Sequence, residues 1–132
     1  MANISITEIT ETGTTSSLSD CNTGCDEFIN SGVEFVRIAN THASQAYNVT
    51  VVAQTTSIDH PGFGNLTKAN AVKQVNAGQT IYLGPFKQRS FDDSDGKVQL
   101  TYLTTGGAAL STVSSGSHAL KIEVLYLKQS LY

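Results

Sequence analysis

The stretch GPFKQRSFDDSDGKVQLTY, residues 84–102, contains three structural signals in direct succession. A Gly-Pro corner opens it, an aspartate-rich segment ending in Gly96 follows, and Val98, Leu100 and Tyr102 then alternate with polar residues. Strict alternation places these three apolar side chains on one face of a β-strand. The stretch therefore predicts a tight turn that leads directly into a core strand.

The segment DDSDG, residues 92–96, allows two interpretations, a calcium-binding loop or a tight turn. An EF-hand loop needs oxygen ligands at positions 1, 3 and 5, glycine at position 6 and glutamate at position 12. With Gly96 at position 6, position 1 is Phe91 and position 12 is Tyr102, so both ends fail. A turn needs only an aspartate that bonds the downstream backbone and a glycine that accepts positive φ. We predict a turn without a metal, with Phe91 as a core residue beside it.

Further alternating segments lie on both sides of this stretch, at residues 33–40, 47–54, 71–86 and 118–128. The side chains expected to point inward are Val36, Ile38, Tyr47, Val49, Val51, Ala53, Leu120, Ile122, Val124 and Tyr126. Segment 71–86 indicates two strands around a turn at residues 76–78. Residues 55–70 and 104–117 indicate longer loops, the second with a possible weak edge strand.

These spacings predict an all-β fold, an antiparallel β-sandwich of about seven strands spanning residues 26–132, immunoglobulin-like or jelly-roll-like. The last strand is apolar on both faces near Leu125 and Leu127. Such a strand needs cover on both sides, so it is central, part of an interface, or both. An interface would make a dimer or trimer of neighbouring copies reasonable.

Charge is sparse and unevenly placed along the chain. Charged residues make up 14% of the 132 residues and the net charge is −3, which argues against nucleic acid as a partner. Residues 1–36 hold six acidic residues and no lysine or arginine. We therefore predict an acidic, Ser/Thr-rich N-terminal arm over residues 1–25. It is either solvated or docked on a basic surface, for example through Glu8 and Glu11.

The sequence also lacks signals for a membrane, for secretion or for catalysis. No stretch approaches the roughly 20 apolar residues of a membrane span, and the N-terminus does not resemble a signal peptide, so we expect an intracellular site of synthesis and no membrane partner. Cys21 and Cys25 form a lone C-x3-C, expected as two free thiols in a reducing compartment. His42, His60 and His118 are far apart and match no catalytic motif. We predict a non-enzymatic protein without cofactor or metal.

Four motifs together carry a resemblance to a known class of protein. They are FINSGVEFVRIAN (28–40), VNAGQTIYLGPF (75–86), FDDSDGKVQLTY (91–102) and KIEVLYLK (121–128). This series resembles small β-sandwich proteins encoded among the head genes of tailed bacteriophages, including capsid decoration (cement) proteins of cyanophage heads. The resemblance implies a virion protein on the capsid exterior that binds the major capsid protein and stabilises the shell.

Two other functions stay open at this point. A carbohydrate- or host-surface-binding sandwich would use the aromatic Phe63 in a Gly-rich loop, and an unusual hydrolase would need the histidines to cluster with Asp or Ser. If the protein is a capsid decoration protein, the residues expected to contact the capsid or other copies are Glu8, Glu11, Phe63, Lys87, Arg89, Leu125 and Leu127. Lys87 and Arg89 follow the Gly-Pro corner, where an acidic arm could dock.

Overall fold

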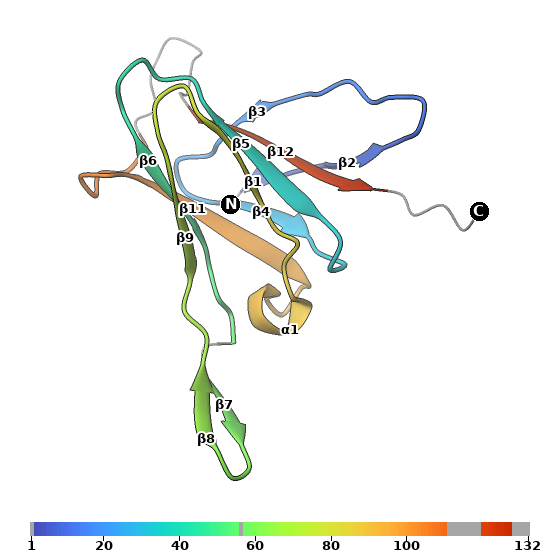
Figure 1. The fold of residues 1–132 in the computed structure, drawn as a ribbon, viewed down its shortest axis with the longest axis vertical. Helices are drawn as coiled ribbons and strands as arrows, with labels where there is room; N and C mark the ends of the chain where they lie inside the picture. The colour runs from blue at the N-terminus through green and yellow to red at the C-terminus, as the bar shows by residue number, and fades with distance from the viewer. Residues whose placement is uncertain (1, 56, 111–119, 128–132) are drawn as a thin grey trace.

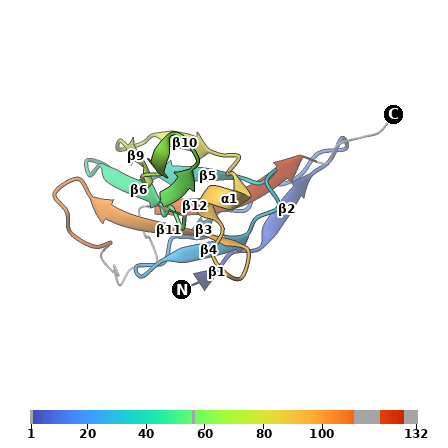
Figure 2. The same cartoon turned by 90° about the horizontal axis from the view of Figure 1, so that it is seen from below.

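Two β-sheets packed against each other form the body of the protein (Figures 1 and 2). The computed structural model describes residues 2–55, 57–110 and 120–127. Sheet A has the spatial order β1 (Ala2–Asn3), β4 (Asp26–Ile29), β11 (Lys97–Thr104), β6 (Tyr47–Val51) and β9 (Ala71–Val75). Sheet B has the order β10 (Thr80–Leu83), β5 (Phe35–Asn40), β12 (Leu120–Leu127) and β2 (Ile6–Ile9), and β3 (Ser19–Asp20) also pairs with β12. The predicted all-β sandwich is confirmed.

The sheets are mixed rather than purely antiparallel, because the N-terminal segment joins both of them. β1 pairs with β4 and β2 pairs with β12 in parallel, while β3 pairs with β12 in antiparallel orientation. These pairings satisfy backbone groups on β4 and β12 that would otherwise be left open. Residues 10–18 leave the sheet between β2 and β3 as a loop that extends from the body (Figure 1). The predicted boundary after residue 25 is therefore no break in the described structure.

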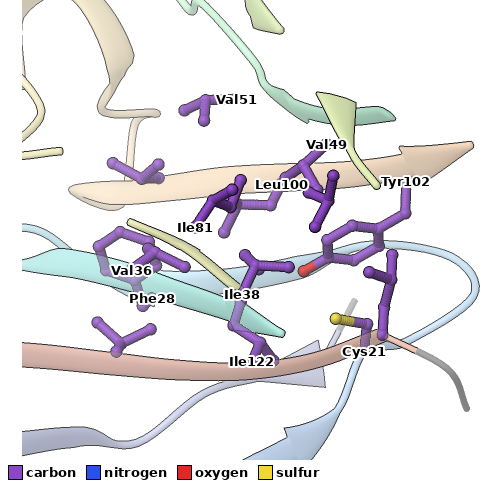
Figure 3. Packing of buried hydrophobic residues seen from close by; sticks show 14 of the residues in the cluster. Cys21, Phe28, Val36, Ile38, Val49, Val51, Ile81, Leu100, Tyr102 and Ile122 are labelled. Carbon is purple, nitrogen blue, oxygen red and sulfur yellow. The ribbon is translucent and has the colours of Figure 1, made fainter. Parts of the chain in front are cut away.

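The core lies between the sheets and is filled by the inward faces of β4, β5, β6, β11 and β12 (Figure 3). Twelve of the predicted inward residues are buried: Val36, Ile38, Tyr47, Val49, Val51, Ala53, Val98, Leu100, Tyr102, Leu120, Ile122 and Val124. Tyr126, which was also predicted to point inward, is only half-buried. β12 is also buried at Leu125, on its other face. The predicted central position of the last strand is confirmed, but its outer face is covered only in part, because Leu127 is 60% exposed. The predicted start of that strand, at His118, lies outside the described residues.

The turn after β9 carries the chain from one sheet to the other. β9 pairs with β6 in sheet A, whereas β10, which follows it, pairs with β5 in sheet B. The buried Asn40 holds this crossing: its Nδ2 donates to the carbonyls of Val75 (3.1 Å) and Gln45 (2.8 Å). The two predicted strands around residues 76–78 thus exist, but they do not form a hairpin with each other.

The Gly-Pro corner and the residues after it close one end of the sandwich. The backbone of Gly84 has φ 112°, and a Cβ there would lie 3.1 Å from the carbonyl oxygen of Glu34, so only glycine fits without a shift. The short helix α1 (Gln88–Phe91) follows. The predicted core position of Phe91 is confirmed, with its ring 5.8 Å from that of Phe86.

Residues 55–70, predicted as a loop, contain a separate hairpin of β7 (Ser57–His60) and β8 (Gly64–Thr67). The hairpin stands off the body below β9 and α1 (Figure 1). Nearly all side chains of this hairpin are exposed. Because neither strand has a buried face, neither shows the alternation of apolar and polar residues from which the other strands were predicted. In the segment 104–117, where a weak edge strand was considered, Ala109 forms an isolated bridge with Leu103 of β11. Residues 111–119 lie outside the described part of the chain.

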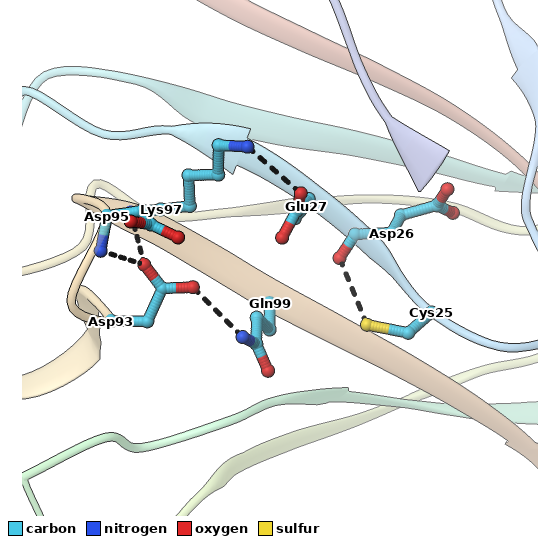
Figure 4. A network of polar contacts seen from close by, with 7 residues as sticks. All are labelled: Cys25, Asp26, Glu27, Asp93, Asp95, Lys97 and Gln99. Atoms are coloured by element: carbon cyan, nitrogen blue, oxygen red, sulfur yellow. Dashed lines mark hydrogen bonds and ion pairs between the residues drawn. The ribbon is translucent and has the colours of Figure 1, made fainter. Parts of the chain in front are cut away.

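The DDSDG segment forms the predicted turn (Figure 4). Asp93 Oδ1 accepts the backbone N–H groups of Asp95 (2.9 Å) and Lys97 (3.0 Å), and Gly96 has φ 75°. Asp93 Oδ2 accepts the side-chain amide of Gln99 at 2.9 Å. The hydrogen bonds from Lys97 and Gln99 lower the pKa of Asp93. The Asp93 carboxylate therefore holds the turn that starts β11.

Replacing Asp93 by alanine should lower the free energy of unfolding by about 1–2 kcal/mol, because hydrogen bonds to a carboxylate are lost at a partly exposed site. The matched control is Asp95→Ala, whose side chain is exposed and which takes part in the turn through its backbone N–H. The control should change stability by no more than about 0.5 kcal/mol. Urea unfolding followed by circular dichroism measures both. Equal losses would mean that the Asp93 carboxylate does not hold the turn.

Candidate functional site

The seven predicted contact residues lie at separate places on the surface. Phe63 is at the tip of the β7–β8 hairpin, and Lys87 and Arg89 are exposed at α1. Glu8 is on β2 and Glu11 is exposed in the turn that follows. Leu125 and Leu127 share the outer face of β12, where Leu125 is buried and Leu127 is 60% exposed. The structure thus gathers them at three places: Phe63 on the hairpin, Lys87 and Arg89 at α1, and the other four on β12, β2 and the turn after β2.

The β7–β8 hairpin presents an uncovered aromatic side chain. Phe63 is 80% exposed, and the glycines on both sides of it, Gly62 and Gly64, have positive φ, which shapes the tight turn. The ring of His60 packs against Phe63 edge-on, with centroids 5.2 Å apart. Leu66 is also 51% exposed. A two-stranded hairpin without a core of its own is only marginally stable in water, so this element is suited to packing against a partner.

A hollow of about 240 Å³ lies on the outer face of sheet B, and we call it the outer pocket. Its lining residues are Ile9, Thr14, Ser16, Phe35, Arg37, Tyr82, Glu123 and Leu125. Tyr82 is 65% exposed, and its ring lies 6.4 Å from that of Phe35. Leu127 pairs with Ile9 across β12 and β2, so it extends the apolar surface beside the pocket. The predicted contact residues Leu125 and Leu127 therefore belong to one apolar surface.

The polar wall of the outer pocket is a neutralised pair that also anchors the N-terminal segment. Arg37 Nη1 lies 3.3 Å from Glu123 Oε2. The same carboxylate accepts the hydroxyl of Ser16 (2.7 Å) and the N–H of Ser17 (3.0 Å). Burial acts to raise the pKa of Glu123, but these hydrogen bonds and Arg37 outweigh it and lower the pKa. The pocket therefore carries no uncompensated charge from this pair.

The acidic N-terminal segment does not lie on Lys87 and Arg89 within one chain. Asp20 pairs with Lys121 of β12, and the hydroxyl of Tyr126 donates to Glu8 at 2.9 Å. Neither Lys87 nor Arg89 forms an ion pair with another described residue. Among the described residues, the corner with Lys87 and Arg89 is therefore not occupied by the acidic segment of the same chain.

A second hollow, of about 290 Å³, separates the N-terminal segment from β4 and β12. Three carboxylates line it, those of Asp20, Asp26 and Glu123. Asp20 and Glu123 are paired with cations, and Asp26 accepts the hydroxyl of Tyr102 at 2.7 Å. Burial raises the pKa of Asp26. These groups are satisfied within the fold, and among the described residues no group of three or more His, Cys, Asp or Glu could hold a metal ion.

The thiols and histidines do not assemble into a reactive group in the described part of the chain. Cys21 and Cys25 are free, and burial raises the pKa of both, which disfavours the nucleophilic thiolate. The Nδ1 of His42 accepts backbone N–H groups in the loop between β5 and β6, whereas His60 is on the hairpin. His118 lies outside the described residues.

Comparison of the chain with models of protein families, with curated proteins and with solved structures gives no match in any of the three. Among the described residues, none of the helices is of a length and apolarity that would cross a membrane.

The candidate surfaces are the hairpin tip and the outer pocket, which are defined by their geometry alone. Phe63 and Leu125 are among the contact residues predicted from the sequence, whereas Phe35 and Tyr82 are not, because strand alternation does not show which outward residues meet across a sheet.

Proposed function

We propose that this protein is a virion structural protein that binds the outside of a phage capsid and stabilises it, without enzymatic activity. Its partners are the major capsid protein and neighbouring copies of itself. The observation that carries the proposal is the β7–β8 hairpin, which stands off the body with Phe63 exposed (Figure 1). The motif series in residues 28–128 adds the resemblance to decoration proteins.

The physical requirements of a decoration protein fit this form. Such a protein needs a rigid body that resists deformation, and here two sheets enclose one core. It also needs contacts that are individually weak but repeated, because many copies on a lattice gain avidity from modest interfaces. A surface with few charges and exposed apolar side chains at separate positions, such as Phe63 and Leu127, provides contacts of this kind.

Mixing the purified protein with undecorated capsids of the phage that encodes it tests the proposal. We expect saturable binding, measured by co-sedimentation, and a higher temperature at which the shells burst, because a ligand that binds only the intact shell stabilises it. An unrelated acidic β-sandwich of similar size serves as the control and should neither bind nor protect. Absence of binding to both expanded and unexpanded shells would contradict the proposal.

A carbohydrate-binding module is the second candidate, because the exposed Phe63 ring packed against His60 offers an aromatic side chain of the kind that lines small-molecule sites. The two candidates differ in their ligands. A glycan array probed with the wild type and with Phe63→Ala separates them: signals that disappear in the variant would favour the module, and background alone would remove this candidate.

A further inference from the structure

The chain carries two uncovered apolar features of complementary form, a knob and a hollow. The knob is Phe63, an aromatic ring 80% exposed at the tip of a hairpin. The hollow is the outer pocket, whose apolar walls are Ile9, Phe35, Tyr82 and Leu125. An exposed aromatic ring and an open apolar pocket are each unfavourable in water, and both are relieved when one fills the other.

The sizes of the two features agree. The outer pocket encloses about 240 Å³. An apolar cavity of about 150 Å³ is large enough to take a benzene molecule. By volume, the outer pocket is therefore large enough to take the phenyl ring of Phe63. Tyr82 and Phe35 line the pocket with rings, and an entering ring would meet them in the tilted or edge-on arrangements that aromatic pairs prefer.

The geometry places the two features on different parts of the molecule. The hairpin extends from one end of the body, whereas β2, which forms one wall of the pocket, lies at the side of the body, away from the hairpin (Figure 1). No residue between 57 and 67 is among the described residues that line the pocket. We propose that Phe63 of one copy inserts into the outer pocket of a second copy of this chain.

Such a contact is head-to-tail, because it joins two different surfaces: the hairpin tip of one copy and the outer pocket of the next. Head-to-tail contacts close into rings when the rotation between copies permits, and otherwise they continue as chains. Either arrangement suits a lattice, so this inference deepens the proposed function by naming the contact between neighbouring copies. The inference rests on the proposed function in one respect: binding to a shell would hold the copies close together. One inserted ring gives weak association in dilute solution.

Tryptophan fluorescence tests the contact without a shell, since the chain contains no tryptophan. The tracer is Phe63→Trp, which puts a single indole on the knob. The titrant is Phe63→Ser, which keeps the pocket but cannot insert a knob of its own. We expect the tracer emission to move to shorter wavelength and to saturate as titrant is added, up to roughly millimolar concentration. Circular dichroism checks that both variants are folded.

A second titrant adds Tyr82→Lys to Phe63→Ser, which places a charge at the pocket. Its matched control adds Val72→Lys instead, at a residue on β9 outside the pocket that is 60% exposed, close to the 65% of Tyr82. We expect Tyr82→Lys to weaken binding at least about tenfold and Val72→Lys to leave it within about twofold. No shift with the first titrant, or equal weakening by the two lysine substitutions, would overturn the inference.

The outcomes separate this contact from shell binding. A saturable, Tyr82-dependent shift together with no binding of wild type to capsids would support the contact between copies and contradict the proposed function. Capsid binding without any shift would leave the proposed function standing and overturn the contact.

Discussion

Replacing Phe28 by alanine is expected to lower the free energy of unfolding by about 3–5 kcal/mol. The Phe28 side chain is fully buried, and its ring lies 6.0 Å from that of Phe86, at the end of the sandwich closed by the Gly-Pro corner. Removing it leaves a cavity between β4 and the segment that leads to α1. Because domains of this size are stable by only about 5–15 kcal/mol, the loss is a large fraction of the total. Urea unfolding measures it.

The neighbouring residue provides the control for this prediction. Ile29 follows Phe28 on β4, points to the opposite face and is 57% exposed. Ile29→Ala should change stability by no more than about 0.5 kcal/mol. Comparable losses in the two variants would show that β4 does not present Phe28 to the core in the manner described.

Replacing Glu123 by alanine is expected to cost about 2–3 kcal/mol, because the change leaves Arg37 without its carboxylate and removes the acceptor for Ser16 and Ser17. The Glu123 side chain is 2% exposed and that of Arg37 is 26% exposed, so the cost is lower than for a fully buried pair. The loop of residues 10–18 should also become more sensitive to protease. Unfolding curves and limited proteolysis measure the two effects.

The pair of Asp20 and Lys121 is the control, because it also joins the N-terminal segment to β12 but is more exposed. Lys121→Ala should cost less than about 1 kcal/mol, as surface ion pairs do. If loss of Lys121 destabilised the protein as much as loss of Glu123, the buried carboxylate would not be the main anchor of this segment.

The contribution of Glu123 should depend on pH. Its pKa is lower in the folded protein than the ordinary value of 4.5, so its stabilisation is fully present above that value. It is lost as the pH falls through the lowered pKa, where the folded state must take up a proton. The difference in stability between the wild type and Glu123→Gln should therefore be large at pH 7 and shrink below about pH 4. A difference that grows on acidification would contradict this assignment.

Much of the body could be predicted because its strands have one buried and one exposed face. Period-two patterns identified the inward sides of β5, β6 and β11 correctly, for example at Val98 and Leu100. The turn at residues 92–96 was predictable because its geometry depends on local chemistry, the Asp93 carboxylate and the positive φ of Gly96. Local sequence carries enough information for features of this kind.

The remaining features depend on contacts between distant segments. β2 pairs with β12 more than a hundred residues away, and nothing in the Ser/Thr-rich N-terminal sequence specifies that partner. The crossing between sheets after Val75 has the same local pattern as a hairpin. The outer pocket combines residues from β2, β5, β10 and β12 with the loop that follows β2, so no single stretch of sequence reveals it.

Imaging of phage heads tests the central claim most directly. The proposed function implies that a tailed phage encodes this chain, so electron cryomicroscopy should compare heads of that phage with the gene intact and with the gene deleted, at the same reconstruction symmetry. The proposed function predicts extra density on the outer surface at positions that repeat with the lattice, absent from the deletion heads. Identical outer surfaces, or density found only inside the shell or on the tail, would contradict it.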